Sequence, residues 1–488
     1  MRAIKRGNIK VTVKNCERIL LILLVIISIL NLIFANQFAV TLAIVSVLVL
    51  ICGFYHLGNA FKWATGIFLL LGLVIAQYDH FALARLIDAV NSMDNLIVLL
   101  IVMQLFTIPI AVGRYQSSIV TLVNGKLPTN RSLFGFTMLI TFLLSSILSM
   151  GTVPIIYSIL GPTIKQRLGD QYDHFSSVAI SRSFTLGTLW APGAATIFLI
   201  STITHVPIQK LFVPSFILGL LGLCIAWLIE LNWSSSTKNA NQNIKSQINT
   251  KKATLKVFQI GLAVVALLLI AFTLIHLKIG EAMIDVALAG LVVILLWLLV
   301  LQVRDHDHQR TVKAGKEYMQ SGLLRGGSLA PFFVAIGLFS NVFEHSQISK
   351  IIGQVLAPSI LHLSWGALVL IPLFIVILSL VGVHPLASVT LLGQIMMGIS
   401  LPFNALSIAM GLNIGSMLAY MMSPFAGIVV VIANILGISS TTISLKWNGK
   451  YCLLLLVVSV IFIAGYSIWQ IVKFKLNILV DRKTHKGL

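Results

Sequence analysis

Charged side chains are scarce in this chain of 488 residues, and acidic ones are the scarcest. Only 10% of the residues are charged, with 14 Asp and Glu against 34 Lys and Arg, while 58% are hydrophobic. The mean hydropathy of +0.99 is far above that of soluble domains. The composition excludes a soluble catalytic domain and indicates a multi-pass membrane protein, for which the bacterial cytoplasmic membrane is the expected location.

Cysteine and catalytic motifs are also sparse. The four cysteines (Cys16, Cys52, Cys224 and Cys452) are scattered singly, so no CxxC metal or redox spacing exists. No HExxH, GxSxG or GxxxxGK[ST] motif occurs, which argues against a metalloprotease, a serine hydrolase and an ATP-driven pump. We therefore expect no enzyme activity, no metal and no cofactor, and energy supplied by an ion gradient, a partner or the substrate's own gradient.

The excess of basic residues has a membrane explanation. A net charge of +20 could suggest nucleic acid, but basic loops beside a membrane account for it more simply, and no nucleic-acid partner is expected. The N-terminus, residues 232–255 and residues 304–325 are basic and predict the cytoplasmic side. Eleven crossings then place the C-terminus outside, although the basic tail favours the other side; either the rule fails at the last helix or the count is off by one.

Apolar runs predict an all-α fold of about eleven transmembrane helices. The start resembles a signal peptide, but its apolar run continues to about Phe34 without a clear cleavage site, so a retained first helix is favoured within residues 1–38. A first repeat at 39–231, a cytoplasmic linker at 232–255, a second repeat at 256–473 and a basic tail at 474–488 follow. Full spans are expected near 19–36, 39–55, 61–77, 95–112, 209–231, 256–276, 283–303, 327–343 and 451–473.

One pattern of glycine and proline breaks occurs twice. SMGTVPI (149–155) and LWAPGAAT (189–196) in the first half match LVGVHPLAS (380–388) and MMSPFAG (421–427) in the second. Aligned, Gly151 meets Gly382, Pro154 meets Pro385 and Pro192 meets Pro424. The breaks predict re-entrant hairpins at 133–165 and 366–398 and broken helices at 177–205 and 403–437, in two inverted repeats. Irregular backbone at membrane depth survives only where protein or a cavity satisfies it, so the pattern favours a secondary transporter.

This architecture resembles the ion transporter superfamily, which includes divalent anion/sodium symporters, citrate and C4-dicarboxylate carriers and arsenite permeases. The resemblance covers about residues 39–473 and is one of architecture. The hairpin tips read Met150-Gly151-Thr152 and Val383-His384-Pro385, where the divalent-anion branch has Ser-Asn-Thr. The resemblance implies transport of a small anion, movement of hairpins and broken helices as a unit, and a homodimer.

The residues at the breaks suit an anion. A helix that restarts in mid-membrane has unpaired N–H groups and a partial positive charge. Ser423-Pro424 fits the signature of a capping residue followed by a first-turn proline, Thr152 with Pro154 fits it approximately, and Ala191-Pro192 and His384-Pro385 supply the proline without a standard cap. The predicted substrate-binding residues are Ser149, Gly151, Thr152, Pro154, Thr188, Pro192, Gly193, His384, Pro385, Ser388, Ser423 and Pro424.

The coupling ion is expected to be Na⁺ or H⁺, with Thr152, His384, Asn413 and Ser416 as candidate ligands. Each hydroxyl can instead bond its own helix backbone, and His384 can be a neutral residue bonded to backbone. Arg182 either meets the anion or extends to the cytoplasmic interface. Glu281 and Asp285 read as interfacial residues, with a proton relay as the alternative.

The leading hypothesis is an ion-coupled secondary transporter of a small anion, with carboxylates as the expected class. A carrier of lipid-linked or phosphate-bearing substrates is one alternative, since the basic loops could meet anionic head groups. A non-transporting membrane assembly protein is the other. Apart from substrate and lipid, a second copy of the chain is the only partner expected.

Overall fold

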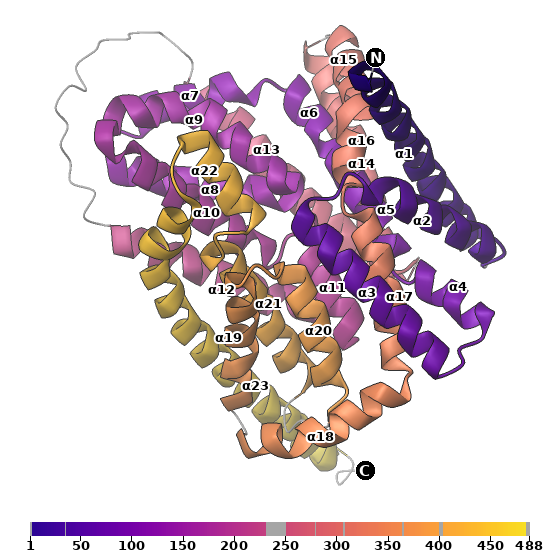
Figure 1. The fold of residues 1–488 in the computed structure, drawn as a ribbon. Helices are drawn as coiled ribbons and strands as arrows, with labels where there is room; N and C mark the ends of the chain where they lie inside the picture. Colours follow the sequence, from indigo (N-terminus) through magenta and orange to yellow (C-terminus); the bar gives the residue numbers. More distant parts are fainter. Residues whose placement is uncertain are drawn as a thin grey trace.

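The computed structural model describes residues 2–34, 36–230, 250–278, 280–305, 308–363, 366–399 and 404–484. Within these ranges every regular element is a helix (Figure 1). Ten segments are long and apolar enough to cross a membrane, against about eleven predicted for the whole chain. The prediction of an all-α, multi-pass membrane fold is confirmed.

The described part of the chain begins with seven α-helices and one short 3-10 helix. They are α1 (Arg2–Ile33), α2 (Ala39–Phe54), α3 (Asn59–Tyr78), α4 (Leu83–Asn91), α5 (Asp94–Met103), η1 (Gln104–Phe106), α6 (Thr107–Val112) and α7 (Tyr115–Lys126). Helix α1 begins well before the predicted first span, because the basic residues continue its helical turns outside the apolar run. Helices α4 and α7 were not predicted, since each is too short or too polar to read as a membrane span.

The first repeat continues with a helical hairpin and a broken helix. Its elements are α8 (Asn130–Leu148), η2 (Ser149–Gly151), α9 (Thr152–Leu168), η3 (Gly169–Gln171), α10 (Tyr172–Thr188), α11 (Ala195–Thr204) and α12 (Ile208–Ile229). Thr129 and Ser132 form a capping box that starts α8. The chain reverses at residues 149–151 and the long helix stops at residues 189–194, the two places where the sequence breaks were predicted.

The second half has a hairpin and a broken helix in the same order, after its own set of preceding helices. Its elements are α13 (Thr250–His276), α14 (Ala282–Asp305), α15 (His308–Glu317), the π-helix η5 (Tyr318–Gly322), α16 (Leu323–Gly326), α17 (Ala330–Glu344), α18 (Gln347–Leu363), α19 (Gly366–Leu380), α20 (Pro385–Met397), α21 (Ala405–Met422), α22 (Gly427–Leu436), the π-helix η6 (Thr442–Trp447) and α23 (Gly449–Thr484). The hairpin is α19 and α20, and the broken helix is α21 and α22.

Three boundaries differ from the predictions. The basic segment 304–325 was expected to be a loop, but α15, η5 and α16 occupy most of it, because charged side chains on an amphipathic helix can face water while the opposite face packs. Of the predicted linker 232–255, residues 232–249 lie outside the described part, and residues from Thr250 onward already belong to α13. The predicted tail 474–488 is helical to Thr484.

The same packing arrangement occurs in both halves. Helix α8 packs on α10 as α19 packs on α21, and the second hairpin arm of each half contacts the short half-helix of the other, α9 with α22 and α11 with α20. Helix α10 lies beside α22 and η6, while α11 lies beside α21. The two broken helices therefore run in opposite directions past each other in the centre of the molecule (Figure 1).

Both breaks in these long helices are built as the same turn. In the first break the Ala194 amide donates to the Ala191 carbonyl at 3.0 Å, and in the second the Ala426 amide donates to the Ser423 carbonyl at 3.1 Å. Each turn carries proline at its second position, where the fixed φ of Pro192 or Pro424 fits. The prediction that Ser423-Pro424 caps the restarting helix was wrong, because α22 restarts only at Gly427 and Ser423 ends α21.

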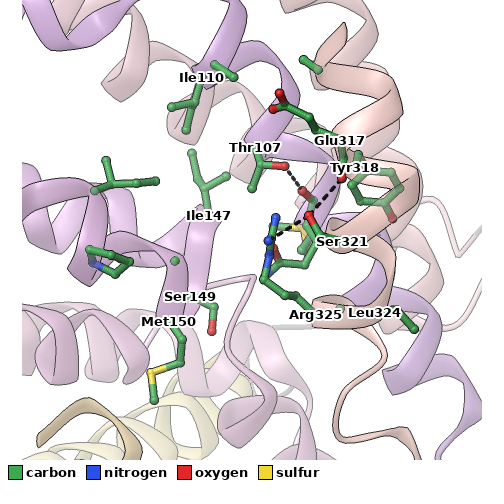
Figure 2. Close-up of a pocket in the computed structure, with 18 of the residues that line it drawn as sticks. Thr107, Ile110, Ile147, Ser149, Met150, Glu317, Tyr318, Ser321, Leu324 and Arg325 are labelled. Carbon is green, nitrogen blue, oxygen red and sulfur yellow. Dashed lines mark hydrogen bonds between the residues drawn. The ribbon is translucent and has the colours of Figure 1, made fainter. Parts of the chain in front are cut away.

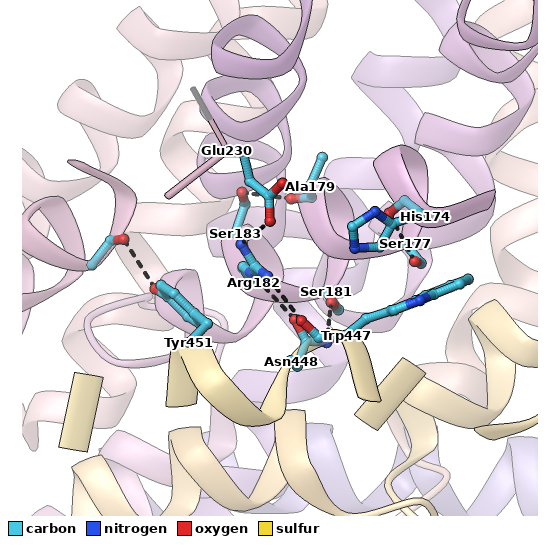
Figure 3. A network of polar contacts seen from close by, with 11 residues as sticks. His174, Ser177, Ala179, Ser181, Arg182, Ser183, Glu230, Trp447, Asn448 and Tyr451 are labelled. Atoms are coloured by element: carbon cyan, nitrogen blue, oxygen red, sulfur yellow. Dashed lines mark hydrogen bonds and ion pairs between the residues drawn. The ribbon is translucent and has the colours of Figure 1, made fainter. Parts of the chain in front are cut away.

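Arg182 holds the first broken helix in place. It lies inside α10 with a relative exposure of 2%. Its guanidinium donates to Asn448 Oδ1, Glu230 Oε1 and the Trp447 carbonyl, each at 3.0 Å, and lies over the Tyr451 ring (Figure 3). Three hydrogen bonds and one ring contact thus engage the group within the protein, so Arg182 ties α10 to the ends of α12 and η6. Neither predicted alternative, contact with substrate or extension to the interface, describes this arrangement.

Candidate functional site

A large cavity of about 1770 Å³ lies between the first hairpin tip and the N-terminal helices. On one side it is lined by Ser149, Met150, Gly151 and Pro154 of the tip and by Gly193 of the first break. On the other side lie residues of α1, η1, α6, η5 and α16, including Gln104, Thr107, Tyr318 and Ser321 (Figure 2). We call this space the large cavity.

Basic side chains predominate on the wall facing the tip. The charged residues that line the large cavity are Lys14, Arg18, Arg114 and Arg325 against Glu17 and Glu317, with His56 beside them. Glu17 is already paired with His56, whose Nδ1 lies 2.7 Å from its carboxylate. Arg325 donates to Ser321 Oγ at 3.0 Å, and its side chain is exposed within the cavity. The lining therefore carries an excess of positive charge, which favours an anionic occupant.

The tip that faces these cations is strained. Ser149 has φ 48° and ψ −135°, a combination that glycine adopts readily and serine does not. Backbone strain of this kind costs of order 1–3 kcal/mol and persists only where the surrounding structure imposes it. Figure 2 shows Ser149 and Met150 at the tip, across the cavity from Ser321 and Arg325.

Contacts join the first tip to both breaks. The Gly193 amide donates to the Ser146 carbonyl at 3.1 Å, and a Cβ at Gly193 would lie only 2.8 Å from that oxygen. Met150 reaches the other break, since its Cε would lie 2.6 Å from a Cβ added at Gly427. Asn413 of α21 donates to the Leu189 carbonyl at 2.9 Å. Tip, first break and second break thus form one contiguous unit.

The second tip is closed by its own contacts. Ser423 Oγ donates to the Ser379 carbonyl at 2.6 Å and accepts from the Phe425 amide at 3.2 Å. His384 caps α20, because its Nδ1 accepts from the Leu386 amide at 3.2 Å, and Pro385 takes the first helical position. The sequence predicted a restart without a standard capping residue, and here the imidazole takes that role. Its ring packs against Phe61 at a centroid distance of 4.1 Å.

The structure separates the predicted substrate residues into two groups. Ser149, Gly151, Pro154 and Gly193 line the large cavity. The residues that belong to neither cavity described here are Thr152, Thr188, Pro192, His384, Pro385, Ser388, Ser423 and Pro424. Arg114 and Arg325 were not among the predicted site residues, although Arg325 lies in the basic segment that was interpreted as a loop.

The candidate coupling-ion residues have different surroundings. Asn413 uses both amide protons, on the Leu189 carbonyl and on Ser215 Oγ at 3.0 Å. Thr188 Oγ1 donates to Thr185 O of its own helix. Thr152, Ser388 and Ser416 have buried hydroxyls for which the described residues supply no hydrogen-bond partner. A search of the described residues also found no group of three His, Cys, Asp or Glu side chains that could hold a metal ion.

A small cavity of about 520 Å³ lies at the other end of the same helices. Its lining includes Met93, Ser201, Ser340 and Gln394. Helices α5, α11 and α17 each run from one cavity to the other: the large cavity touches Leu100, Ala195 and Leu329, and the small one touches Met93, Ser201 and Ser340. At 1.5 Å per helical residue the two cavities are about 10–15 Å apart.

One ion pair lies across the small cavity. His205 Nε2 of α11's C-terminal cap lies 3.2 Å from Glu344 Oε1 at the end of α17, and both residues line the cavity. The pair joins the first broken helix to the helix that flanks it, and both side chains are largely exposed.

The overall architecture has a solved counterpart. The fold is similar to the crystal structure of the YdaH transporter of Alcanivorax borkumensis, with a TM-score of 0.54 and 13% sequence identity over 84% of this chain and 98% of that one. No protein-family model and no curated protein matches the sequence. The chain therefore is a multi-pass membrane protein that shares the fold of a membrane transporter.

Proposed function

We propose that this protein is a secondary transporter of a small anion, with carboxylates as the expected substrate class. The observation that carries the proposal is the large cavity, which is lined by an interrupted, strained hairpin tip, by a helix break and by Arg114 and Arg325. Helix α11 begins at Ala195 without a side-chain cap and adds about half an elementary positive charge at that end. An anion between the tip and the arginines would interact with both.

The repeated architecture supports alternating access. The hairpins and broken helices form one contiguous unit, and cavities lie at both ends of its boundary with α5 and α17. Movement of this unit against the other helices would open one cavity while closing the other. The large cavity contains basic residues of α1 and α16, so the positive-inside rule assigns it to the cytoplasmic side. Membership of the ion transporter superfamily and coupling to Na⁺ or H⁺ are parts of the same proposal.

The first experiment is a thermal-stability panel on the purified protein. Mono-, di- and tricarboxylates, inorganic phosphate, sulfate and lipid phosphates are tested with sodium, with choline and at two pH values. A compound that binds the folded state raises the melting temperature according to its concentration over its Kd. Stabilisation by one carboxylate supports the proposal; a response to lipid phosphates alone supports a lipid carrier, and no response at all contradicts small-anion transport.

A matched pair of variants locates the site. Arg325→Gln removes a charge from the large cavity, and Arg85→Gln removes the same charge from an exposed position on α4. Loss of a charge-assisted hydrogen bond costs about 1.5–3 kcal/mol, so Arg325→Gln should weaken carboxylate binding about 10- to 100-fold while Arg85→Gln leaves it unchanged. Equal effects of the two substitutions would contradict this site.

A further inference from the structure

Asp94 is a buried carboxyl group that the transport site does not use. It begins α5, and its relative exposure is 1%. Ser46 of α2 donates to its Oδ1 at 2.9 Å. Its other oxygen, Oδ2, is fully buried, and the part of the chain that the structure describes places no hydrogen-bond partner on it. Half of this carboxyl group is therefore unsatisfied.

Two opposing effects act on the charge of Asp94. An ionised carboxylate in such surroundings loses its hydration, which costs several kcal/mol, and the neighbours Ala89, Leu96 and Ile97 are buried and apolar. The start of α5 and the Ser46 hydroxyl favour the ionised form instead. A carboxyl group held between these effects can exist with or without a proton, and a proton on Oδ2 would remove the charge from this apolar site.

Asp94 follows directly after two residues that line a cavity. Ser92 and Met93, the two residues before it, line the small cavity. On the neighbouring helix α1, Ser28 Oγ donates to Asn95 Oδ1 at 3.5 Å, and Asn95 donates in turn to Glu281. The titratable groups on the elements around this end of α5 are Arg85 and Asp88 on α4, His205 at the end of α11, Glu281 and Asp285 at the start of α14, and Glu344 and His345 at the end of α17. Lys14, Glu17 and Arg18 of α1 and Arg325 of α16 lie at the far end of α5, beside the large cavity.

We propose that Asp94 is a proton-binding site that exchanges its proton with water in the small cavity. A lone pair of Oδ2 takes a proton from a hydronium ion in that water, the hydronium ion becomes water and the carboxylate becomes a neutral acid. The reverse step returns the proton to water. This inference rests on the proposed transport function, for which it names H⁺ as the coupling ion. The site lies on α5, opposite the unit formed by the hairpins and broken helices, so protonation changes the charge at the boundary along which that unit would move.

The test is an infrared titration of the purified full-length protein, which needs no substrate. The carbonyl stretch of a protonated carboxylic acid is followed from about pH 4, the ordinary range of a free carboxyl group, to about pH 9. We expect a band that titrates reversibly, shifts in D₂O and is missing in Asp94→Asn. Asp88→Asn, which removes an exposed carboxyl group of α4, serves as the control and should keep the band. Asp285 is the competing buried carboxyl group, because neither of its oxygens has a partner among the described residues, and Asp285→Asn should also keep the band.

Ser46→Ala gives a second readout that a purely structural role would not produce. It removes the hydrogen bond that favours the ionised form, so the midpoint of the titration should move to higher pH. A band that never titrates, that fails to exchange in D₂O, or that disappears in Asp285→Asn instead of Asp94→Asn would overturn the proposal. Because no transported compound is involved, this result stands apart from the outcome of the thermal-stability panel.

Discussion

The two hairpin tips share their place in the fold but differ in their surroundings. The first reverses through a strained serine, opens into the large cavity and faces basic side chains. The second reverses through Gly382 at φ 97°, where glycine is unstrained, and is held by the His384 cap, the Ser423 hydroxyl and an aromatic contact, although Val381 and Val383 remain exposed. The two related tips therefore differ in backbone strain and in their neighbours, and the first lines the large cavity while the second lines neither cavity described here.

The largest expected effect concerns the contacts that anchor the two broken helices, which also differ between the halves. A buried ion pair holds α10, whereas the amide of Asn413 holds α21. Arg182→Met leaves Glu230 and Asn448 without their partner and should cost about 3–5 kcal/mol, seen as a lower midpoint of thermal unfolding. Arg131→Met, at an exposed arginine stacked on Trp227, is the control and should change the midpoint little. Similar losses for both would refute a special anchoring role.

The next test compares the two breaks. A Cβ at Gly193 meets the backbone oxygen of Ser146, which cannot move without the hairpin, whereas a Cβ at Gly427 meets only the flexible end of Met150. Gly193→Ala should therefore destabilise the protein by about 1–3 kcal/mol, and Gly427→Ala by clearly less. Thermal unfolding of the two variants side by side measures the difference, and the reverse order would show that the first break is not the tighter one.

Two polar residues on α21 separate anchoring from ion binding. Asn413→Ala removes two hydrogen bonds and leaves the Leu189 carbonyl unpaired, so a loss of about 1–3 kcal/mol is expected. Ser416→Ala removes a hydroxyl without a partner among the described residues and should be nearly neutral. If sodium chloride stabilises the wild type more than choline chloride and Ser416→Ala abolishes that difference, the hydroxyl is an ion ligand after all.

Exchanging the tip residues should give effects of opposite sign. Ser149→Gly relieves the strained backbone and should raise stability by about 1 kcal/mol, while Gly382→Ala introduces strain and should lower it by about 1–2 kcal/mol. Thermal unfolding reports both. A destabilised Ser149→Gly would mean that the contacts of the serine side chain contribute more stability than the backbone strain costs. Side-chain contacts would then stabilise both tips.

The smallest expected effect is that of the ion pair across the small cavity. His205→Gln and Glu344→Gln each remove an exposed pair, which should cost less than about 1 kcal/mol and less still in high salt. A double-mutant cycle on unfolding midpoints measures the coupling. Coupling that survives molar salt would indicate a buried contact rather than the surface pair seen here.

Local signals in the sequence predicted much of this architecture. Proline and glycine close together favour a helix break, so breaks were expected near Gly151, Pro192, Gly382 and Pro424, and the regular α-helix is interrupted at each. Single prolines such as Pro162 and Pro214 lie inside helices instead. The sequence did not reveal where a helix resumes after a break. Ser423 bonds a carbonyl that is 44 residues away in the chain, and that contact places Pro424 in a turn instead of at the start of α22.

Residues whose roles depend on distant partners were the ones missed. From the sequence, Arg182 was expected to meet the anion or to extend to the interface. In the structure it donates to Asn448 and Trp447, which lie more than 260 positions later in the chain. The paired tips were aligned through Gly151 and Gly382, but the residue with positive φ in the first tip is Ser149, so Ser149 is the counterpart of Gly382. No local pattern distinguishes these cases, because each is decided by packing between the halves.

The short distance between the two cavities has an electrical consequence. In the proposed transporter, water entering each cavity would bring the potential of that compartment close to the centre of the molecule. A transmembrane voltage would then fall mainly across the layer between the cavities, which is about 10–15 Å thick from the helical rise. One elementary charge crossing that layer exchanges about 2.3 kcal/mol per 100 mV with the field. A charge that moves by roughly half the hydrocarbon thickness would thus cross nearly the full membrane potential.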